Sequence, residues 1–282
     1  MQQLFEFTVH GLLLGAVYGL IALPFSVVWA TTGTLDAALG GYAVVAGLTA
    51  ASVGFPAGIV VAMLIGTAFG AVMGLVFLGL QARGLEDPIT VVLASLGFLF
   101  AVDSFVLWRF GVDPVYVETF DYTWTFLGVR IPPEGLLTLA VGLTILVILV
   151  AILRYTPLGR SMRACAIDAG AARLVGIPVR AIQFGSFALG GLLAGTAGVL
   201  TVGTSGLSFE QSVPLTLGAF GALIIFGMRG PGTAFLGGLV LGTIEAISAG
   251  YISGGLASLV PLAFILIVLG SGRLDFAQQV RP

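Results

Sequence analysis

Two groups of residues in this 282-residue sequence could do chemistry: a run of arginines and two isolated acids. Five of the eleven arginines lie in "RYTPLGRSMRACAIDAGAARLVGIPVR", residues 154–180. Asp36 and Glu245 each stand alone in a glycine-rich apolar stretch. Dense cations suit protein docking or attraction to anionic lipid, whereas an acid in an apolar segment suits a polar or cationic solute.

The residues that are absent exclude several enzyme classes. Without any lysine the chain has no lysine-containing phosphate loop and no Schiff base. One histidine, His10, and one cysteine, Cys165, cannot form a Cys/His zinc site or an intramolecular disulfide. Ser205 in "GTSG" has only the distant His10 as a possible base, so we interpret that motif as a turn. We expect a protein that is not an enzyme and has no cofactor.

The composition is that of a membrane protein. Hydrophobic residues make up 58% of the chain and charged residues 9%, and the mean hydropathy is +1.14. Because a bilayer core of about 30 Å needs roughly 20 apolar residues per helix, we predict an all-α, polytopic transmembrane bundle of eight to ten spans, forming a single domain over 1–282. The expected spans are 7–30, 36–53, 57–80, 88–110, 135–153, 181–203, 214–228, 232–253 and 257–271. "TTGTLDAALGGY" before the second span indicates a broken or re-entrant helix.

The arginines predict the orientation. Arginine is enriched in short cytoplasmic loops. If 154–180 lies inside, nine arginines are cytoplasmic and only Arg109 and Arg130 are outside. The loop 111–134 is then external, and so is the N-terminus. We expect a multi-pass protein of a prokaryotic inner or plasma membrane.

Glycines repeat at every fourth position in two of the expected spans. Gly11, Gly15 and Gly19 form one stripe, and Gly66, Gly70 and Gly74 form another. Small residues at this spacing let helix backbones approach closely in lipid, so we predict that both stripes are packing faces.

The arginine-rich segment predicts two short capped helices. Thr156 and Pro157 form a helix start, and that helix should run to about Ile167. Asp168 can cap a second helix, which should end at Gly176 before Pro178. Ala171, Ala172, Leu174 and Val175 give this second helix an apolar side. A topogenic loop needs no such order, so we favour a docking element over a lipid-attracted loop.

At these residues the chain resembles the permease subunits of ATP-binding-cassette importers, in particular the branched-chain amino acid group. "GRSMRACAIDAGAARLVGIP" is similar to that family's coupling segment, which inserts into a groove of the cytoplasmic ATPase. The stretches at 11–33, 87–100, 187–200 and 213–247 fit as well, so the resemblance covers most of the chain outside 111–134. It implies that the ATPase-coupling positions are Arg160, Arg163, Ala164, Ala171, Ala172 and Gly176.

One departure from the family concerns the substrate. After the first span the family shows a motif like G-x-x-N-F-A-H-G-E, whereas Asp36, Leu39 and Gly41 hold the Asn, His and Glu positions here. Ionisable groups in lipid cost a few kcal/mol and face a cavity or the bundle interior. The candidate substrate pathway is therefore Thr34, Asp36, Gly40, Gly41, Thr90, Ser95 and Glu245. Asp36 and Glu245 could also have purely structural roles, as a helix cap and as a buried hydrogen-bonded acid.

The resemblance implies transport of branched-chain or other amino acids, or of a related small polar solute, driven by separate ATPase subunits. The implied partners are a second permease subunit, homologous or identical, two cytoplasmic ATP-binding subunits, an extracytoplasmic solute-binding protein and membrane lipid, with no nucleic acid. A self-sufficient secondary transporter or channel that uses a buried carboxylate remains the alternative. Transport by the purified chain without ATP would distinguish the two.

Overall fold

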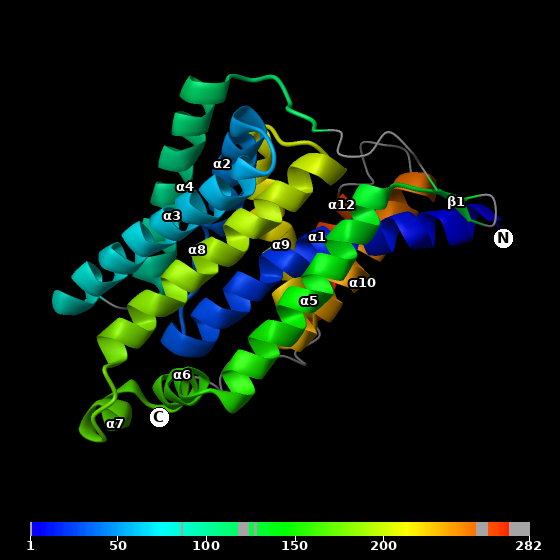
Figure 1. The fold of residues 1–282 in the computed structure, drawn as a ribbon. Helices are drawn as coiled ribbons and strands as arrows, with labels where there is room; N and C mark the ends of the chain where they lie inside the picture. The colour runs from blue at the N-terminus through cyan, green and yellow to red at the C-terminus, as the bar shows by residue number, and fades with distance from the viewer. Residues whose placement is uncertain (1, 86, 118–123, 127–128, 252–258, 271–282) are drawn as a thin grey trace.

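The computed structural model describes residues 2–85, 87–117, 124–126, 129–251 and 259–270, and these are almost entirely helical (Figure 1). The helices are α1 (Gln2–Thr32), α2 (Leu39–Val53), α3 (Ala57–Ala82), α4 (Pro88–Phe110), α5 (Pro133–Tyr155), α6 (Pro157–Ile167), α7 (Ala169–Leu174), α8 (Val179–Thr204), α9 (Ser212–Ile225), α10 (Pro231–Tyr251) and α12 (Leu259–Gly270). A short 3₁₀ turn, η1 (Phe209–Gln211), precedes α9, and β1 (Trp124–Phe126) pairs antiparallel with β2 (Val129–Ile131). This small ribbon lies in the loop 111–134, where no strand was expected.

Six helices are long and apolar enough to cross a membrane: α1, α3, α4, α5, α8 and α10. They correspond to six of the nine expected spans. The other three expected spans are present as shorter helices, with 15 residues in α2, 14 in α9 and 12 in α12. By length alone, therefore, the part of the chain that the structure describes contains about six full spans, fewer than the eight to ten expected.

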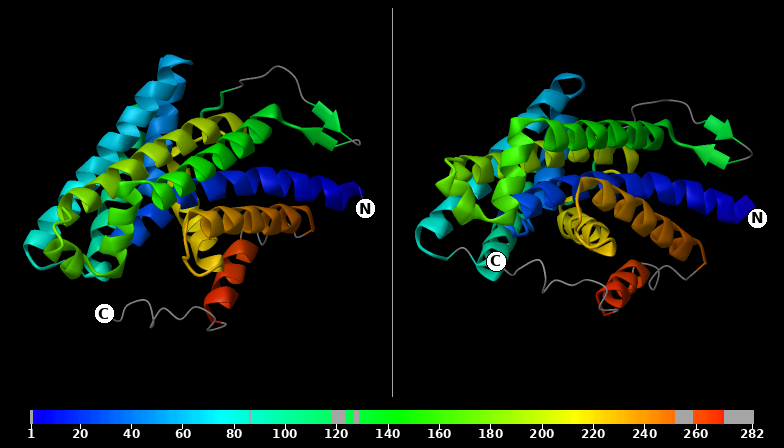
Figure 2. Two further views of the ribbon diagram at one scale, coloured as in Figure 1. Left: turned by 60° about the horizontal axis from the view of Figure 1, so that its bottom comes forward. Right: turned by 90° about the horizontal axis from the view of Figure 1, so that it is seen from below.

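The long helix α1 is the centre of the bundle. It packs against α10 and α8, while α3 lies along α8, and α2 contacts α3, α8 and α9 (Figures 1 and 2). Phe25 of α1, Tyr42 of α2 and Phe187 of α8 are among the largest fully buried side chains. The outer helices α3, α4 and α5 instead expose many apolar side chains, as a bilayer or a second subunit requires.

Both glycine stripes are helix contacts, as the sequence predicts. Gly15 on α1 lies against the backbone of Gly238 and Leu239 on α10. Gly66 and Gly70 on α3 lie against Gly191 on α8. In each case a β-carbon would collide with the backbone of the facing helix, so the two close helix pairs depend on glycine.

The expected helix break separates α1 from α2. The chain leaves α1 at Gly33, whose φ of +67° favours glycine, and residues 34–38 form no helix. The break is not at the surface, because Thr34 and Asp36 are both almost fully buried.

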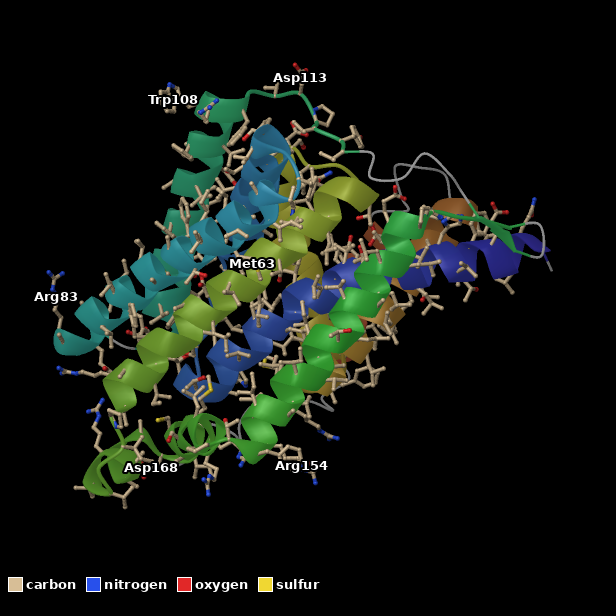
Figure 3. The ribbon with its side chains drawn as sticks, viewed as in Figure 1. Met63, Arg83, Trp108, Asp113, Arg154 and Asp168 are labelled. Carbon is tan, nitrogen blue, oxygen red and sulfur yellow. The ribbon has the colours of Figure 1, made fainter. Side chains whose placement is uncertain are left out.

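Most arginines lie at one end of the bundle. Arg83, Arg154 and the segment that contains Asp168 are at the same end in Figure 3, opposite Trp108 and Asp113. Gln81 near the end of α3 donates a hydrogen bond to Gln183 near the start of α8 (3.3 Å), and Arg229 lines a cavity together with Arg154. The arrangement matches the charge asymmetry from which the orientation was inferred.

We expect single cysteines at the two ends of α4 to label from opposite sides of the membrane. Leu85 and Val112 are exposed and flank α4. In a Cys165→Ser background, a membrane-impermeant thiol reagent added to intact cells should modify Val112→Cys, and should modify Leu85→Cys only after permeabilisation. The unsubstituted chain is a further control and should label weakly, since burial raises the pKa of the Cys165 thiol and reduces the reactive thiolate. The reverse labelling pattern would overturn the orientation.

Candidate functional site

The segment 154–180 folds as the two capped helices that its sequence predicts. The Thr156 hydroxyl accepts a hydrogen bond from the Gly159 N–H (3.2 Å), and Pro157 begins α6. Asp168 then caps α7, because its Oδ1 accepts hydrogen bonds from the N–H groups of Gly170 (2.7 Å) and Ala171 (2.9 Å). Gly176 ends the turn with a φ of +84° before α8 begins.

A small core of its own holds this coupling segment together. Cys165 of α6, Ala172 of α7 and Val179 of α8 are buried against each other, with Ala164 partly buried beside them. Gly159 lies directly on the backbone of Leu153, which sets α6 across the end of α5. Ala172, one of the expected ATPase-coupling positions, is therefore buried inside the segment.

The apolar surface of the coupling segment is formed by other residues. Ile167, Leu174 and Val175 are 86%, 90% and 77% exposed, although all three are large and apolar. Ile167 ends α6, and Leu174 and Val175 lie at the end of α7, the helix farthest from the bundle in this segment (Figure 1). We call these three residues the apolar tip. An exposed apolar group on a well-ordered element is typical of a protein contact.

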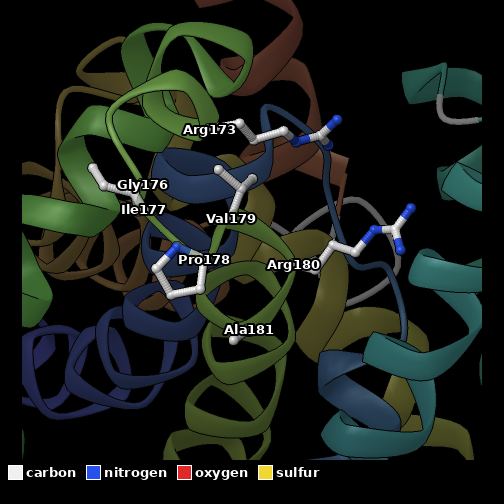
Figure 4. Close-up of a pocket in the computed structure, with 7 residues that line it drawn as sticks. All are labelled: Arg173, Gly176, Ile177, Pro178, Val179, Arg180 and Ala181. Carbon is white, nitrogen blue, oxygen red and sulfur yellow. The ribbon is translucent and has the colours of Figure 1, made fainter.

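The arginines of the segment lie at two cavities and on the exposed side of α6. Arg173 and Arg180 line a pocket of about 540 Å³ together with Pro178 and Val179 (Figure 4). Arg160 is exposed on α6, whereas Arg163 lines a different cavity, toward the bundle. The segment 154–180 thus carries exposed apolar residues and exposed arginines on the same two short helices and their ends.

At the helix break, Asp36 is hydrogen-bonded within its own chain segment. Its Oδ1 accepts from the Ala38 N–H (3.0 Å), and its Oδ2 accepts from the Tyr42 hydroxyl (3.1 Å). The side chain is 1% exposed. This geometry organises the start of α2, because the carboxylate satisfies a backbone N–H that the helix leaves unpaired.

Two hydroxyl groups from other helices form hydrogen bonds with the backbone at the break. The Ala37 N–H donates to Oγ of Ser95 on α4 (2.9 Å). The Gly40 N–H donates to Oγ1 of Thr216 on α9 (3.2 Å), and that hydroxyl donates to the Ala37 carbonyl (3.2 Å). The unwound backbone is thereby satisfied by protein groups, as an irregular segment inside a membrane bundle requires.

Glycines let these helices approach the break. A β-carbon at Gly40 would collide with the Ser212 carbonyl and the Thr216 hydroxyl of α9. At Gly41 it would meet Leu99 and Val102 of α4. Of the expected substrate-pathway residues, the structure therefore gathers Thr34, Asp36, Gly40, Gly41 and Ser95 around one buried break.

The other two expected pathway residues are not part of this cluster. Thr90 is in the first turn of α4, where its N–H (2.9 Å) and hydroxyl (2.8 Å) donate to Asp87. Glu245 on α10 lies beside Tyr18 of α1. Tyr18 is in the middle of α1, and its ring packs against Gly218 of α9, two residues after the Thr216 that bonds the break.

Sequence reasoning missed Tyr42, Thr216 and Tyr18, which are the partners of the predicted residues. Thr216 stands out as a polar side chain in an apolar span, which is a weak signal. Nothing in the sequence pairs it with Gly40, 176 residues away.

The comparisons with known proteins agree with this architecture. The family model described as the permease component of a branched-chain amino acid transport system matches residues 7–269. The chain belongs to this family. As a member of this permease family, it is the non-catalytic membrane subunit of an ATP-binding-cassette type transport system.

Among curated relatives are two proteins named high-affinity branched-chain amino acid transport system permease protein LivH, from Salmonella typhimurium LT2 and Escherichia coli K12. Each is 25% identical over 292 residues, covering 95% of this chain and 92% of the relative. No solved structure matches the chain. The similarity extends over nearly the whole permease, including both the coupling segment and the break.

Proposed function

We propose that this permease imports a small polar solute of the amino acid class, branched-chain amino acids included, across a bacterial inner membrane. Two cytoplasmic ATPase subunits would drive the import, a second permease subunit would complete the pore, and an extracytoplasmic binding protein would deliver the solute. The observation that carries the proposal is the coupling segment: two capped helices with an apolar tip and exposed arginines.

The placement of the coupling segment suggests how ATPase movement reaches the bundle. α5 leads directly into α6, and α7 leads directly into α8. α8 in turn packs along α2 and α3, and α2 begins at the break. A displacement of the apolar tip would therefore be transmitted along rigid helices to the break, where α1, α2, α4 and α9 meet.

We assign Asp36 a structural role at the break, as the group that holds the turn before α2 and the Tyr42 hydroxyl. An asparagine can still accept the Ala38 N–H and donate to the Tyr42 oxygen, whereas an alanine leaves both without a partner. An unpaired polar group at such a buried site costs about 1–3 kcal/mol. We expect Asp36→Asn to keep uptake within roughly twofold of the wild type and Asp36→Ala to lose about tenfold or more of the folded, active permease.

Uptake normalised to assembled complex, together with the thermal stability of the purified permease, checks this assignment. If Asp36→Asn assembles like the wild type but loses uptake as severely as Asp36→Ala, the charge itself is required. Such a result would show that Asp36 contacts a substrate ammonium group and does not have only a structural role.

Reconstitution tests the proposed function as a whole. Proteoliposomes that contain the permease, its ATPase subunits and the binding protein should accumulate radiolabelled leucine only when ATP is present on the side of the membrane that carries the ATPase subunits. Proteoliposomes that contain the permease alone should show no uptake. Uptake by the permease alone, driven by a proton or ion gradient, would instead support a secondary transporter.

A further inference from the structure

The cytoplasmic end of the bundle also has a cavity that is separate from the apolar tip. A cavity of about 340 Å³ opens between the last turn of α1, the last turn of α5, the side of α6 and the start of α10. Three arginines line it: Arg154 of α5, Arg163 of α6 and Arg229 just before α10. No acidic side chain is among the residues that line it.

The cavity gathers positive charge beyond these three guanidinium groups. Gly230 and Pro231 at the start of α10 also line it, so the N-terminal end of a 21-residue helix faces the same space. The unpaired N–H groups of a helix N-terminus favour an anion there. Like charges collected without a counterion repel each other, and an anion in the cavity would relieve this repulsion.

The remaining wall of the cavity is apolar. Val27 of α1 and Val150 and Leu153 of α5 belong to helices long enough to span the membrane. Arg154, one turn after Val150, lies at the cytoplasmic end of α5, where the helix leaves the hydrocarbon under the orientation given above (Figure 3). Basic groups therefore lie at headgroup level, directly next to an apolar surface at acyl-chain level.

We propose that this cavity is a specific site for one anionic phospholipid of the cytoplasmic leaflet. The guanidinium forks of Arg154, Arg163 and Arg229 would bind the phosphodiester, and the apolar wall would hold the first part of an acyl chain. A free phosphate would use the arginines but not the wall. The bound lipid would bridge α5, α6 and the α9–α10 turn, and so fix the base of the coupling segment. The site requires the orientation of the bundle but not the proposed transport function.

Lipid retention by the purified full-length permease tests the site. After delipidation, native mass spectrometry with added phosphatidylglycerol should show one tightly retained lipid, and phosphatidylcholine should be retained far less. The double variant Arg154→Gln/Arg229→Gln should bind phosphatidylglycerol at least about tenfold more weakly, since each lost guanidinium removes a charge-assisted contact. Arg83→Gln at the end of α3 removes an arginine at the same end of the bundle but outside the cavity, and should bind like the wild type.

A stability measurement keeps the test independent of mass spectrometry. Phosphatidylglycerol should raise the thermal unfolding midpoint of the wild type and of Arg83→Gln, but not that of the double variant. Equal retention by the double variant, or equal retention of phosphatidylcholine, would overturn the proposal. An equal stabilisation by inorganic phosphate alone would assign the cavity to a free anion. If adding the ATPase subunits releases the lipid, the cavity is a contact site for the ATPase and not a lipid site.

Discussion

Leu174→Asp is expected to abolish most of the coupling between ATP hydrolysis and transport while leaving the permease folded. Leu174 is 90% exposed, so the change removes nothing from the bundle core. In the assembled transporter a buried leucine contributes about 1.5–3 kcal/mol, and a carboxylate in the same apolar groove adds a desolvation cost. We expect substrate-stimulated ATP hydrolysis and uptake to fall by about tenfold or more. Both are measured in the reconstituted complex, after normalisation to permease in the membrane.

Two further variants separate docking from folding. Leu85→Asp places the same charge on an exposed leucine at the same end of the bundle, but outside the coupling segment, and should keep normal coupling. Ala172→Asp places it in the small core with Cys165 and Val179, and should lower the amount of folded permease as well as coupling. Unchanged stimulation in both Leu174→Asp and Ile167→Asp would show that the apolar tip does not contact the ATPase.

Gly70→Leu is expected to cause the largest loss of stability. Gly70 faces the Phe187 carbonyl and the backbone of Gly191 on α8, and backbone atoms cannot move aside as a flexible side chain can. Forcing a leucine between α3 and α8 should cost roughly 3 kcal/mol or more. We expect the yield of monodisperse permease in detergent to fall by about tenfold or more.

Gly79→Leu is the matched control for this variant. Gly79 lies on the same helix, and a β-carbon there would meet nothing within 4 Å. Its yield and thermal unfolding midpoint should therefore stay close to those of the wild type. If both leucine variants behave alike, close packing between α3 and α8 does not determine the stability of the bundle.

Local rules in the sequence were sufficient for features that depend on a few neighbouring residues. Thr156 and Asp168 cap their helices as predicted, and Gly176 adopts the left-handed conformation that ends the turn. Capping depends on a side chain and an N–H two or three residues away, so it can be inferred from spacing. The long spans follow from composition for a similar reason, because bilayer thickness fixes the number of apolar residues that a helix needs.

The sequence was less informative about the lengths of the short helices and about the role of each residue in the coupling segment. α2 and α9 have the apolar composition of spans but are shorter, because both begin beside the buried break. Ala171 and Ala172 look equivalent in sequence, yet Ala171 is exposed and Ala172 is buried against Cys165. Which face of a six-residue helix is covered depends on how α6 crosses the end of α5.

By itself, the sequence determined that this protein is a helical membrane bundle with a capped, basic segment at 154–180 and a helix break at Asp36. Only the tertiary structure decided that Asp36 is satisfied by Ala38 and Tyr42, that Glu245 lies beside Tyr18, and that Arg154, Arg163 and Arg229 share one cavity. The physical reason is the range of the interactions. Caps and spans are set by neighbours in the chain, whereas these pairings join helices far apart in sequence, and close packing at glycine brings such helices together.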